Sequence, residues 1–343
     1  MKKNFVRFGL VFLLSLAFLY FFFRSVDWGE VLGHLGRVHP VFAVLLVVLV
    51  PLHLLTRAFR WRFLLMHEKK DVKFSNMFAG NAVGFTVTLV FPGRLGELVK
   101  PLYLAGKERM RKGFVIGTVV VERIFDVFTM CALLGLFLLA KPLYASLFKI
   151  DAETSRMLKV SGFLGAGAAL AVLLVSLSLY FFRERTLRVF AWFLRPFPEQ
   201  FSKKILNLAG EFIEGLKFFH SVGNLLVYTA LSFVVWLGIV LYYWILFFAY
   251  GHPVAFFTLI PYVFLTMIGA SIPTPGMVGG FHFFSRMGIT SLYPDIDPNM
   301  AVSMTIVVHA VQVVVTCLIG YAILWKDGLS LLQLKKLGES TNA

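Results

Sequence analysis

Ionisable residues stand in the middle of long apolar stretches of this sequence. In VVVERIFDVF, Glu122 and Asp126 are four positions apart and share one face of a helix, with Arg123 beside Glu122. Paired carboxylates can transfer protons, bind a metal ion or hold basic side chains. Charges inside a membrane are rare and typically functional. The cluster is therefore a candidate site, and a structural salt bridge between helices is the equal alternative.

Two further stretches carry charged residues of the same kind. FPGRLGELVKP places Arg94, Glu97 and Lys100 at three-residue steps, which puts them on one broad face of a short helix. LLTRAFRWRFLL ends an apolar run, and Arg57 is the deepest of its three arginines. We expect some of these arginines only to reach the lipid headgroups. The alternative for the first stretch is a solvated surface.

Counted together, these interior candidates carry an excess of positive charge. Three basic residues, three acidic residues and one further arginine make up the set: Arg94, Lys100, Arg123, Glu97, Glu122, Asp126 and Arg57. A cavity with that excess suits a phosphate headgroup, because guanidinium and ammonium groups bind phosphate oxygens.

The composition indicates the elements that must position these residues. Hydrophobic residues make up 59% of the chain and charged residues 15%, and the mean hydropathy is +0.81. Apolar runs of about twenty residues recur without strand-like alternation, which predicts an all-α polytopic membrane protein. The net charge of +15 comes from Lys and Arg beside the apolar runs. That pattern is the usual topogenic bias, so we expect no nucleic-acid partner.

Six segments are long enough to cross a membrane: 5–23, 41–66, 113–140, 157–182, 222–250 and 299–325. Two further apolar regions, 75–106 and 254–291, are interrupted by Pro and Gly. The positions of the basic residues place both termini in the cytoplasm, and each interrupted region then starts and ends on one side. We therefore expect two re-entrant hairpins. Their alternative is an ordinary loop with a turn.

The order of these elements predicts an inverted repeat of span, span, hairpin and span. The first repeat takes residues 1–140. Residues 141–221 hold a fifth helical region, whose span 157–182 belongs to the second repeat, and then a cytoplasmic amphipathic linker. The rest of the second repeat takes 222–326, and 327–343 form a cytoplasmic tail.

The two hairpin tips share a pattern. The chain has only two Pro-Gly dipeptides, Pro92-Gly93 and Pro275-Gly276, and each has another glycine three residues on. Pro ends a helix, Gly permits a tight reversal, and the next helix begins with free amides that attract anions. The expected tip and lining residues are Pro92, Gly93, Gly96, Pro275, Gly276, Gly279, Gly280 and His282. His309 is a weaker candidate, because a lone buried histidine is usually packed and hydrogen-bonded.

Enzyme signatures are few. The sequence has no Walker A, HExxH or GxSxG motif. Cys131 and Cys317 both lie in apolar runs and form neither a disulfide framework nor a metal site. We expect no cofactor and no resident metal, and a transporter in preference to an enzyme.

The motifs FPGRLGELVKP, ERIFD and PTPGMVGG, with TRAFRW, resemble those of the flippase-like membrane family related to the transmembrane region of lysylphosphatidylglycerol synthases. The resemblance covers nearly the whole chain. It implies movement of a lipid between leaflets, and motif residues at Arg94, Glu97, Lys100, Glu122, Arg123, Asp126, Pro275 and Gly276. Many members carry a Glu after the glycine pair that corresponds to Gly279-Gly280, where this chain has Phe281 and His282. The chain lacks the soluble aminoacyl-transfer domain of full synthases, so we expect no lysyl transfer.

The sequence thus predicts a lipid flippase that works without ATP in a prokaryotic cell membrane. Its cargo would be a phospholipid, an aminoacyl-phospholipid or a polyprenyl-phosphate glycolipid, and its partners membrane lipids. One alternative is a membrane enzyme, or a subunit of one, that acts on lipid-linked sugars. Another is a scaffold that binds a lipid-modifying enzyme through residues 183–221. The oligomeric state stays open.

Overall fold

The computed structural model describes residues 2–140, 152–216, 221–330 and 333. Its elements are α1 (Lys2–Phe23), α2 (Trp28–Gly36), α3 (Pro40–Leu65), α4 (Phe74–Val90), η1 (Pro92–Arg94), α5 (Gly96–Glu108), α6 (Lys112–Leu139), α8 (Ala152–Phe181), α9 (Arg183–Phe193), α10 (Glu199–Gly215), α11 (Val222–Ala249), η3 (Phe256–Leu259), α12 (Ile260–Ser271), η4 (Pro275–Met277), α13 (Gly280–Leu292) and α14 (Pro298–Lys326). Every regular element in these ranges is helical, as predicted. The start of the predicted region 141–221, residues 141–151, and most of the predicted tail, 334–343, lie outside the described residues.

Four of the described helices are long and apolar enough to cross a membrane: α3, α8 over Ala152–Val175, α11 and α14. A fifth crossing results if α2 and the end of α1, which are bent by 80°, count as one. Helix α6 has 28 residues but carries Glu122, Arg123 and Asp126 near its middle. The chain therefore has several apolar membrane helices, and a total of six crossings stays a prediction.

Two hairpins interrupt this bundle at the predicted Pro-Gly positions. In the first, α4 and α5 pack together on either side of η1, and in the second, α12 and α13 pack on either side of η4. Two successive left-handed residues make each reversal: Gly93 and Arg94 in the first, Gly276 and Met277 in the second. Glycine adopts this conformation without strain, which is why a Pro-Gly pair is suited to the turn.

The arms of each hairpin cross at a pair of glycines. A Cβ at Gly96 would overlap the carbonyl oxygen of Gly84, and one at Gly280 would lie 2.6 Å from the carbonyl oxygen of Gly269. Only glycine allows backbones to approach so closely. Close packing of two glycines therefore holds the arms of each hairpin together in the same way.

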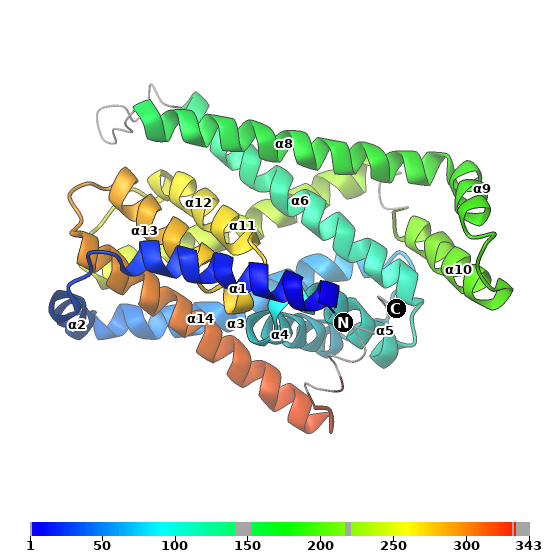
Figure 1. Cartoon of the computed structure of the whole chain (residues 1–343), viewed down its shortest axis with the longest axis horizontal. Helices are drawn as coiled ribbons and strands as arrows, with labels where there is room; N and C mark the ends of the chain where they lie inside the picture. The colour runs from blue at the N-terminus through cyan, green and yellow to red at the C-terminus, as the bar shows by residue number, and fades with distance from the viewer. Residues whose placement is uncertain (1, 141–151, 217–220, 331–332, 334–343) are drawn as a thin grey trace.

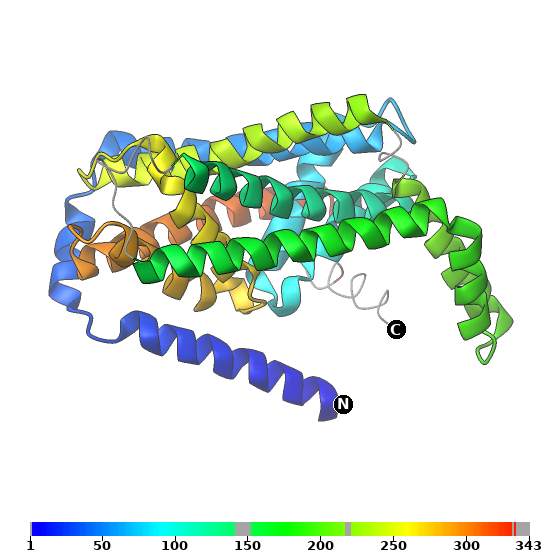
Figure 2. The same ribbon diagram turned by 90° about the horizontal axis from the view of Figure 1, so that it is seen from above.

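The two hairpins lie toward opposite ends of the molecule. Helices α4 and α5 occupy the half nearer α9 and α10, whereas α12 and α13 occupy the half nearer α2 (Figures 1 and 2). The tips η1 and η4 contact each other, and η4 also contacts α4. The two reversals therefore lie against each other, with Gly276 of the second tip buried and Gly93 of the first exposed.

Helices α9 and α10 form an amphipathic pair at one end of the bundle (Figure 1). Helix α10 packs tightly on α6, because Gly113 and Gly117 of α6 lie against the backbone of α10 and Gly215 lies against that of α6. Glu211 of α10 accepts a 2.9 Å hydrogen bond from the Gly113 amide. The pair is therefore fixed to the membrane domain. Its placement along the membrane surface stays a prediction.

Helix α1 stands apart from most of the bundle and touches the second hairpin (Figure 2). Ser15 donates a 2.8 Å hydrogen bond to the carbonyl of Val278, and Gly279 packs against the backbone of Ser15. Arg286 of α13 donates hydrogen bonds to the carbonyls at the end of α1, including that of Phe22. The first helix is therefore held by residues far along the chain.

A buried ion cluster as the candidate functional site

Arg60 is the centre of a charged cluster between α3, α5, α6 and α11. Its side chain is 0% exposed. Its guanidinium donates to Asp126 at 2.7 Å and to Ser232 at 3.2 Å, and it lies 3.5 Å from Glu122. Its guanidinium carbon also lies 5.5 Å from the ring centre of Tyr228. A buried arginine is tolerated only with such pairing, so two carboxylates of α6 and one residue of α3 position one another.

Lys100 reaches one of these carboxylates, Glu122, from the first hairpin. Its ammonium donates a short hydrogen bond to Glu122 and lies 4.2 Å from the ring centre of Trp61. The Trp61 indole donates in turn to Thr118 at 2.9 Å. Lys100 is therefore held by a carboxylate and an aromatic face, both of which favour a cation.

Arg57 lies one helical turn before Arg60 on the same face of α3. It is buried, and it pairs with the second oxygen of Asp126 at the longer distance of 3.5 Å. Its Nε donates to His53 at 2.8 Å, and its guanidinium carbon lies 5.3 Å from the ring centre of Phe85. Arg57 is thus held in place while its ion pair is looser than that of Arg60.

Arg123 forms the more accessible edge of the cluster. It pairs with Asp126 at 3.1 Å and with Glu97 at 3.5 Å, and its side chain is 35% exposed. The other oxygen of Asp126 accepts a 3.1 Å hydrogen bond from Trp236 of α11. Asp126 therefore accepts hydrogen bonds from α3 and α11 on one oxygen and forms ion pairs with arginines of α3 and α6 on the other.

Arg94 belongs to the tip and not to the helix face on which the sequence placed it. It has a positive φ of 56°, which is uncommon for a residue other than glycine. Its guanidinium donates to the carbonyl of Ala270, in the second hairpin, at 3.0 Å. Only Glu97 and Lys100 of the predicted trio lie on α5, and Arg94 instead links the two hairpins.

Several buried polar atoms of the cluster have no hydrogen-bond partner among the described residues. Asn81 of α4 is 0% exposed, yet neither its amide nitrogen nor its oxygen is hydrogen-bonded. It lies four residues before Phe85, and therefore on the helix face that meets Arg57. The other atoms are Arg57 Nη1, Arg60 Nε, Arg94 Nε, Arg123 Nε and Asp126 Oδ2. Buried polar groups are nearly always satisfied, so this arrangement favours a polar guest.

The second hairpin presents uncharged groups at the corresponding place. His309 hydrogen-bonds the carbonyl of Gly276 at 3.0 Å, and its ring centre lies 4.6 Å from that of His282. Gly276 and Gly279 fit closely against α4 and α1 respectively. These glycines and Gly280 are packing positions in the structure, with no room for a side chain. His282 and His309 remain side by side near the tip.

A chain of hydroxyl groups lies behind this tip. Tyr262 and Ser285 are 2.8 Å apart, Ser285 and Thr305 are 2.8 Å apart, and all three are fully buried. The chain joins α12, α13 and α14 without any charge. Sequence reasoning missed it, because serine and threonine in apolar helices carry no local signal of their partners.

Arg60 is the main residue of the cluster that the sequence did not single out. It was expected to share the headgroup region with its neighbours, and the structure instead gives it the most enclosed position. One signal was present: Arg57 and Arg60 are three apart on α3, and Glu122 and Asp126 are four apart on α6. When α3 packs against α6, the arginine face of α3 can therefore form ion pairs with the carboxylate face of α6.

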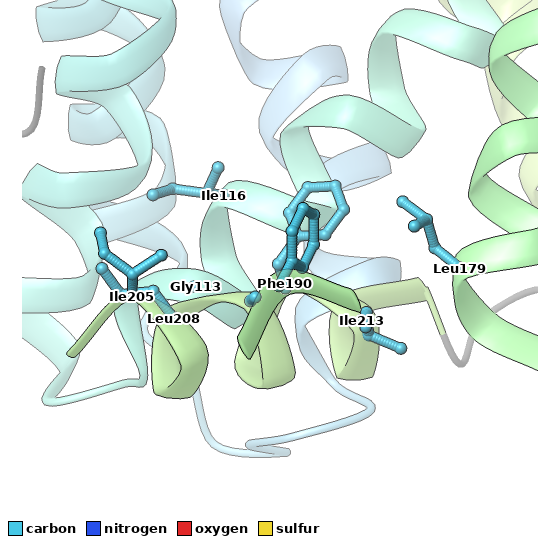
Figure 3. Close-up of a pocket in the computed structure, with 9 residues that line it drawn as sticks. Gly113, Ile116, Leu179, Phe190, Ile205, Leu208 and Ile213 are labelled. Carbon is cyan, nitrogen blue, oxygen red and sulfur yellow. The ribbon is translucent and has the colours of Figure 1, made fainter. Parts of the chain in front are cut away.

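A separate apolar pocket of about 330 Å³ lies between α6, α8, α9 and α10. Figure 3 shows Phe190 of α9 directed into it beside Ile116, Leu179 and residues of α10. Its full lining is Gly113, Ile116, Leu179, Phe190, Ile205, Leu208, Ala209, Phe212 and Ile213. It offers no charged side chain, so it differs in chemistry from the ion cluster.

The matches to known proteins fit this geometry. Residues 8–320 match the family model described as the lysylphosphatidylglycerol synthase transmembrane region. The chain belongs to this family. It is also 24% identical over 292 residues to a UPF0104 membrane protein of Methanothermobacter thermautotrophicus, covering 81% of this chain and 83% of that protein. A UPF0104 membrane protein of Methanocaldococcus jannaschii is 21% identical over 333 residues, covering 94% of this chain and 95% of the relative.

No solved structure matches the chain significantly. The part that matches the lysylphosphatidylglycerol synthase transmembrane family contains both Pro-Gly tips and every charged residue of the cluster. The motif residues expected from the resemblance thus lie in the family's shared region, and those of α5 and α6 form one ion network.

Proposed function

We propose that this protein moves a lipid with a phosphate headgroup between the two leaflets of a prokaryotic cell membrane, without ATP hydrolysis. The observation that supports this most is the buried ion cluster beside two meeting hairpin tips. With Arg60 included, five cations stand there with only three carboxylates. An excess of positive charge in a low-dielectric interior is stabilised by an anion.

In this proposal the chain crosses the membrane six times, with both termini in the cytoplasm. Helices α4–α5 and α12–α13 are re-entrant hairpins that enter from opposite sides, as in an inverted repeat. The shared tip geometry, the glycine crossings and the contact of η1 with η4 support this arrangement. Broken backbone at membrane depth is tolerated where protein or a polar cavity surrounds it.

The residues then have distinct roles. Arg57, Arg94 and Arg123 bind the phosphate oxygens, because each keeps a guanidinium nitrogen without a hydrogen-bond partner among the described residues. Glu122 and Asp126 hold Arg60 and Lys100 in place. The lipid tail stays in the bilayer, and the two repeats rock against each other around the fixed headgroup.

The test is leaflet exchange of labelled lipids in liposomes that contain the purified protein. We expect exchange faster than in empty vesicles, and a loss of about tenfold or more in Arg57→Gln, which corresponds to roughly 1.4 kcal/mol. Arg185→Gln, at an exposed arginine of α9, is the matched control and should leave exchange unchanged. If no phospholipid or prenyl-phosphate lipid exchanges faster than in empty vesicles, the proposal fails.

A further inference from the structure

We propose that the headgroup accepted by the ion cluster is anionic and carries no amine. The inference rests on the proposed function and narrows its cargo to acidic lipid phosphates, such as phosphatidylglycerol or a prenyl phosphate. Zwitterionic and aminoacylated lipids are then poor cargo. Three observations carry it: the carboxylates are occupied, no further carboxylate is within reach, and the cations keep free donors.

Each carboxylate of the cluster already holds a cation of the protein. Glu122 binds Arg60 with one oxygen and Lys100 with the other. Asp126 receives arginines on both oxygens, and Glu97 pairs with Arg123. An ammonium group on a headgroup would have to displace one of these side chains. Removing one partner of a buried ion pair leaves the other charge uncompensated, which is strongly unfavourable.

The second half of the chain supplies no replacement. No Asp or Glu occurs anywhere in residues 215–294, which include α11, α12 and α13, and α14 has none either. The second tip faces the cluster with His282, His309 and backbone groups instead. A headgroup amine between the tips therefore meets no unoccupied carboxylate.

The cations, by contrast, are not saturated. Arg57, Arg94 and Arg123 each have a buried nitrogen with no hydrogen-bond partner in the described parts of the chain. Asn81 adds a fully buried amide with the same property. Phosphate oxygens accept several such donors at once, and guanidinium groups match their geometry. Among the described residues, five such donors of the cluster stand against two acceptors without a hydrogen bond, Asp126 Oδ2 and Asn81 Oδ1, so the cluster suits an added acceptor better than an added donor.

The experiment measures which lipids the purified full-length protein retains. The protein is incubated in micelles with equal amounts of phosphatidylglycerol, phosphatidylethanolamine and lysylphosphatidylglycerol that have the same acyl chains, and the bound lipids are identified by mass spectrometry. We expect phosphatidylglycerol to exceed each of the others about tenfold. Equal or greater retention of either amine-bearing lipid would overturn the inference.

Variants separate the cluster from the basic surface of the protein. Arg57→Gln should lower the preference for phosphatidylglycerol severalfold, whereas Arg185→Gln on exposed α9 should not. Arg123→Gln should raise the retention of phosphatidylethanolamine, because it releases an oxygen of Glu97 and leaves Asp126 Oδ2 paired with Arg57 alone. A preference that persists in both cluster variants would mean surface attraction only and would also overturn the inference.

The outcome is independent of transport. Leaflet exchange without headgroup preference would support the proposed function and remove this inference. A cluster-dependent headgroup preference without leaflet exchange would support this inference and remove the proposed function.

Discussion

The hairpins α4–η1–α5 and α12–η4–α13 reverse through the same pair of left-handed residues and cross at glycines in the same way. The side chains around them differ. Where Gly84 meets Lys100 in the first hairpin, Gly269 meets Phe284 in the second. The position that holds Lys100 of the ion network in the first hairpin therefore holds the apolar Phe284 in the second. The comparison indicates that one set of residues specifies the backbone and another specifies the chemistry.

The division extends to the helices that surround each hairpin. Lys100 joins the first hairpin to the ion pairs of Arg60 with Glu122 and Asp126. The second hairpin is joined to its neighbour α14 through the neutral hydroxyls of Tyr262, Ser285 and Thr305. The charged half has the donors to recognise a ligand. The experiments below test this contrast, beginning with the largest expected effect.

Arg60→Leu should destabilise the protein by about 3–5 kcal/mol, because it leaves the carboxylates of Glu122 and Asp126 buried with one cation fewer. Reversible unfolding in detergent measures this. The double variant Arg60→Leu/Asp126→Leu should recover part of the loss, since apolar pairs can replace buried ion pairs. A single-variant loss below 1 kcal/mol would remove the contrast between the halves.

Gly96→Ala and Gly280→Ala test the shared backbone. Each should cost roughly 1–3 kcal/mol through overpacking, with the larger loss at Gly96, where a Cβ would overlap the carbonyl oxygen of Gly84. Gly106→Ala in α5 is the control, because nothing lies within 4 Å of its Cβ position. If only one hairpin is sensitive in the same unfolding assay, the two are not built alike.

Ser285→Ala should cost only about 1 kcal/mol, because it removes one neutral link between Tyr262 and Thr305. Ser271→Ala, at an exposed serine of α12, should be close to neutral. Both are read from the same unfolding curves. A loss for Ser285→Ala as large as that for Arg60→Leu would contradict the assignment of the weaker network to the second half.

The last prediction concerns pH at the outer ends of the hairpins, where the expected effect is local. Burial raises the pKa of Glu108, but hydrogen bonds from Lys69, Asn76 and the Lys73 amide outweigh it and hold the pKa below its ordinary value of 4.5. A carboxylate with a depressed pKa stabilises the fold above its ordinary pKa, and this contribution is lost as the pH falls through the lowered value.

The second hairpin ends instead in a neutral hydrogen bond from Tyr293 to the carbonyl of Thr258, at 2.9 Å. Acidification should therefore lower the local stability near the end of α5 by about 1 kcal/mol and leave that at the end of α13 unchanged. Amide protection against hydrogen exchange, relative to the intrinsic rate at each pH, measures both. Glu108→Gln should abolish the difference. Equal acid sensitivity at both ends would show that Glu108 is not its source.

The sequence was sufficient for the membrane class and for the hairpin tips, because Pro-Gly pairs within apolar runs have few other conformations. It also suggested that the charges near Lys100 and Glu122 belong together. It was insufficient for Arg60, since depth along one helix does not reveal which helices cover it. Burial of Arg60 depends on α6 and α11, whose partners Asp126 and Ser232 lie 66 and 172 positions further along the chain.

Arg94 and Asn81 show two other limits. Spacing placed Arg94 on the face of α5, but the left-handed turn directs it to Ala270. Asn81 stands in an apolar helix with no nearby charge in sequence, and its position became apparent only where α4, through Phe85, packs against Arg57 of α3. Both depend on tertiary geometry that helical periodicity does not encode.

The attachment of α1 to the second hairpin has a consequence for biosynthesis. The first helix leaves the ribosome early, but Val278 and Arg286, which bind it, are translated more than 250 residues later. Because N-terminal segments are made first, α1 is complete long before the residues that hold it exist. A fusion that restrains the N-terminus would therefore interfere with the last stage of assembly, at the opposite end of the polypeptide.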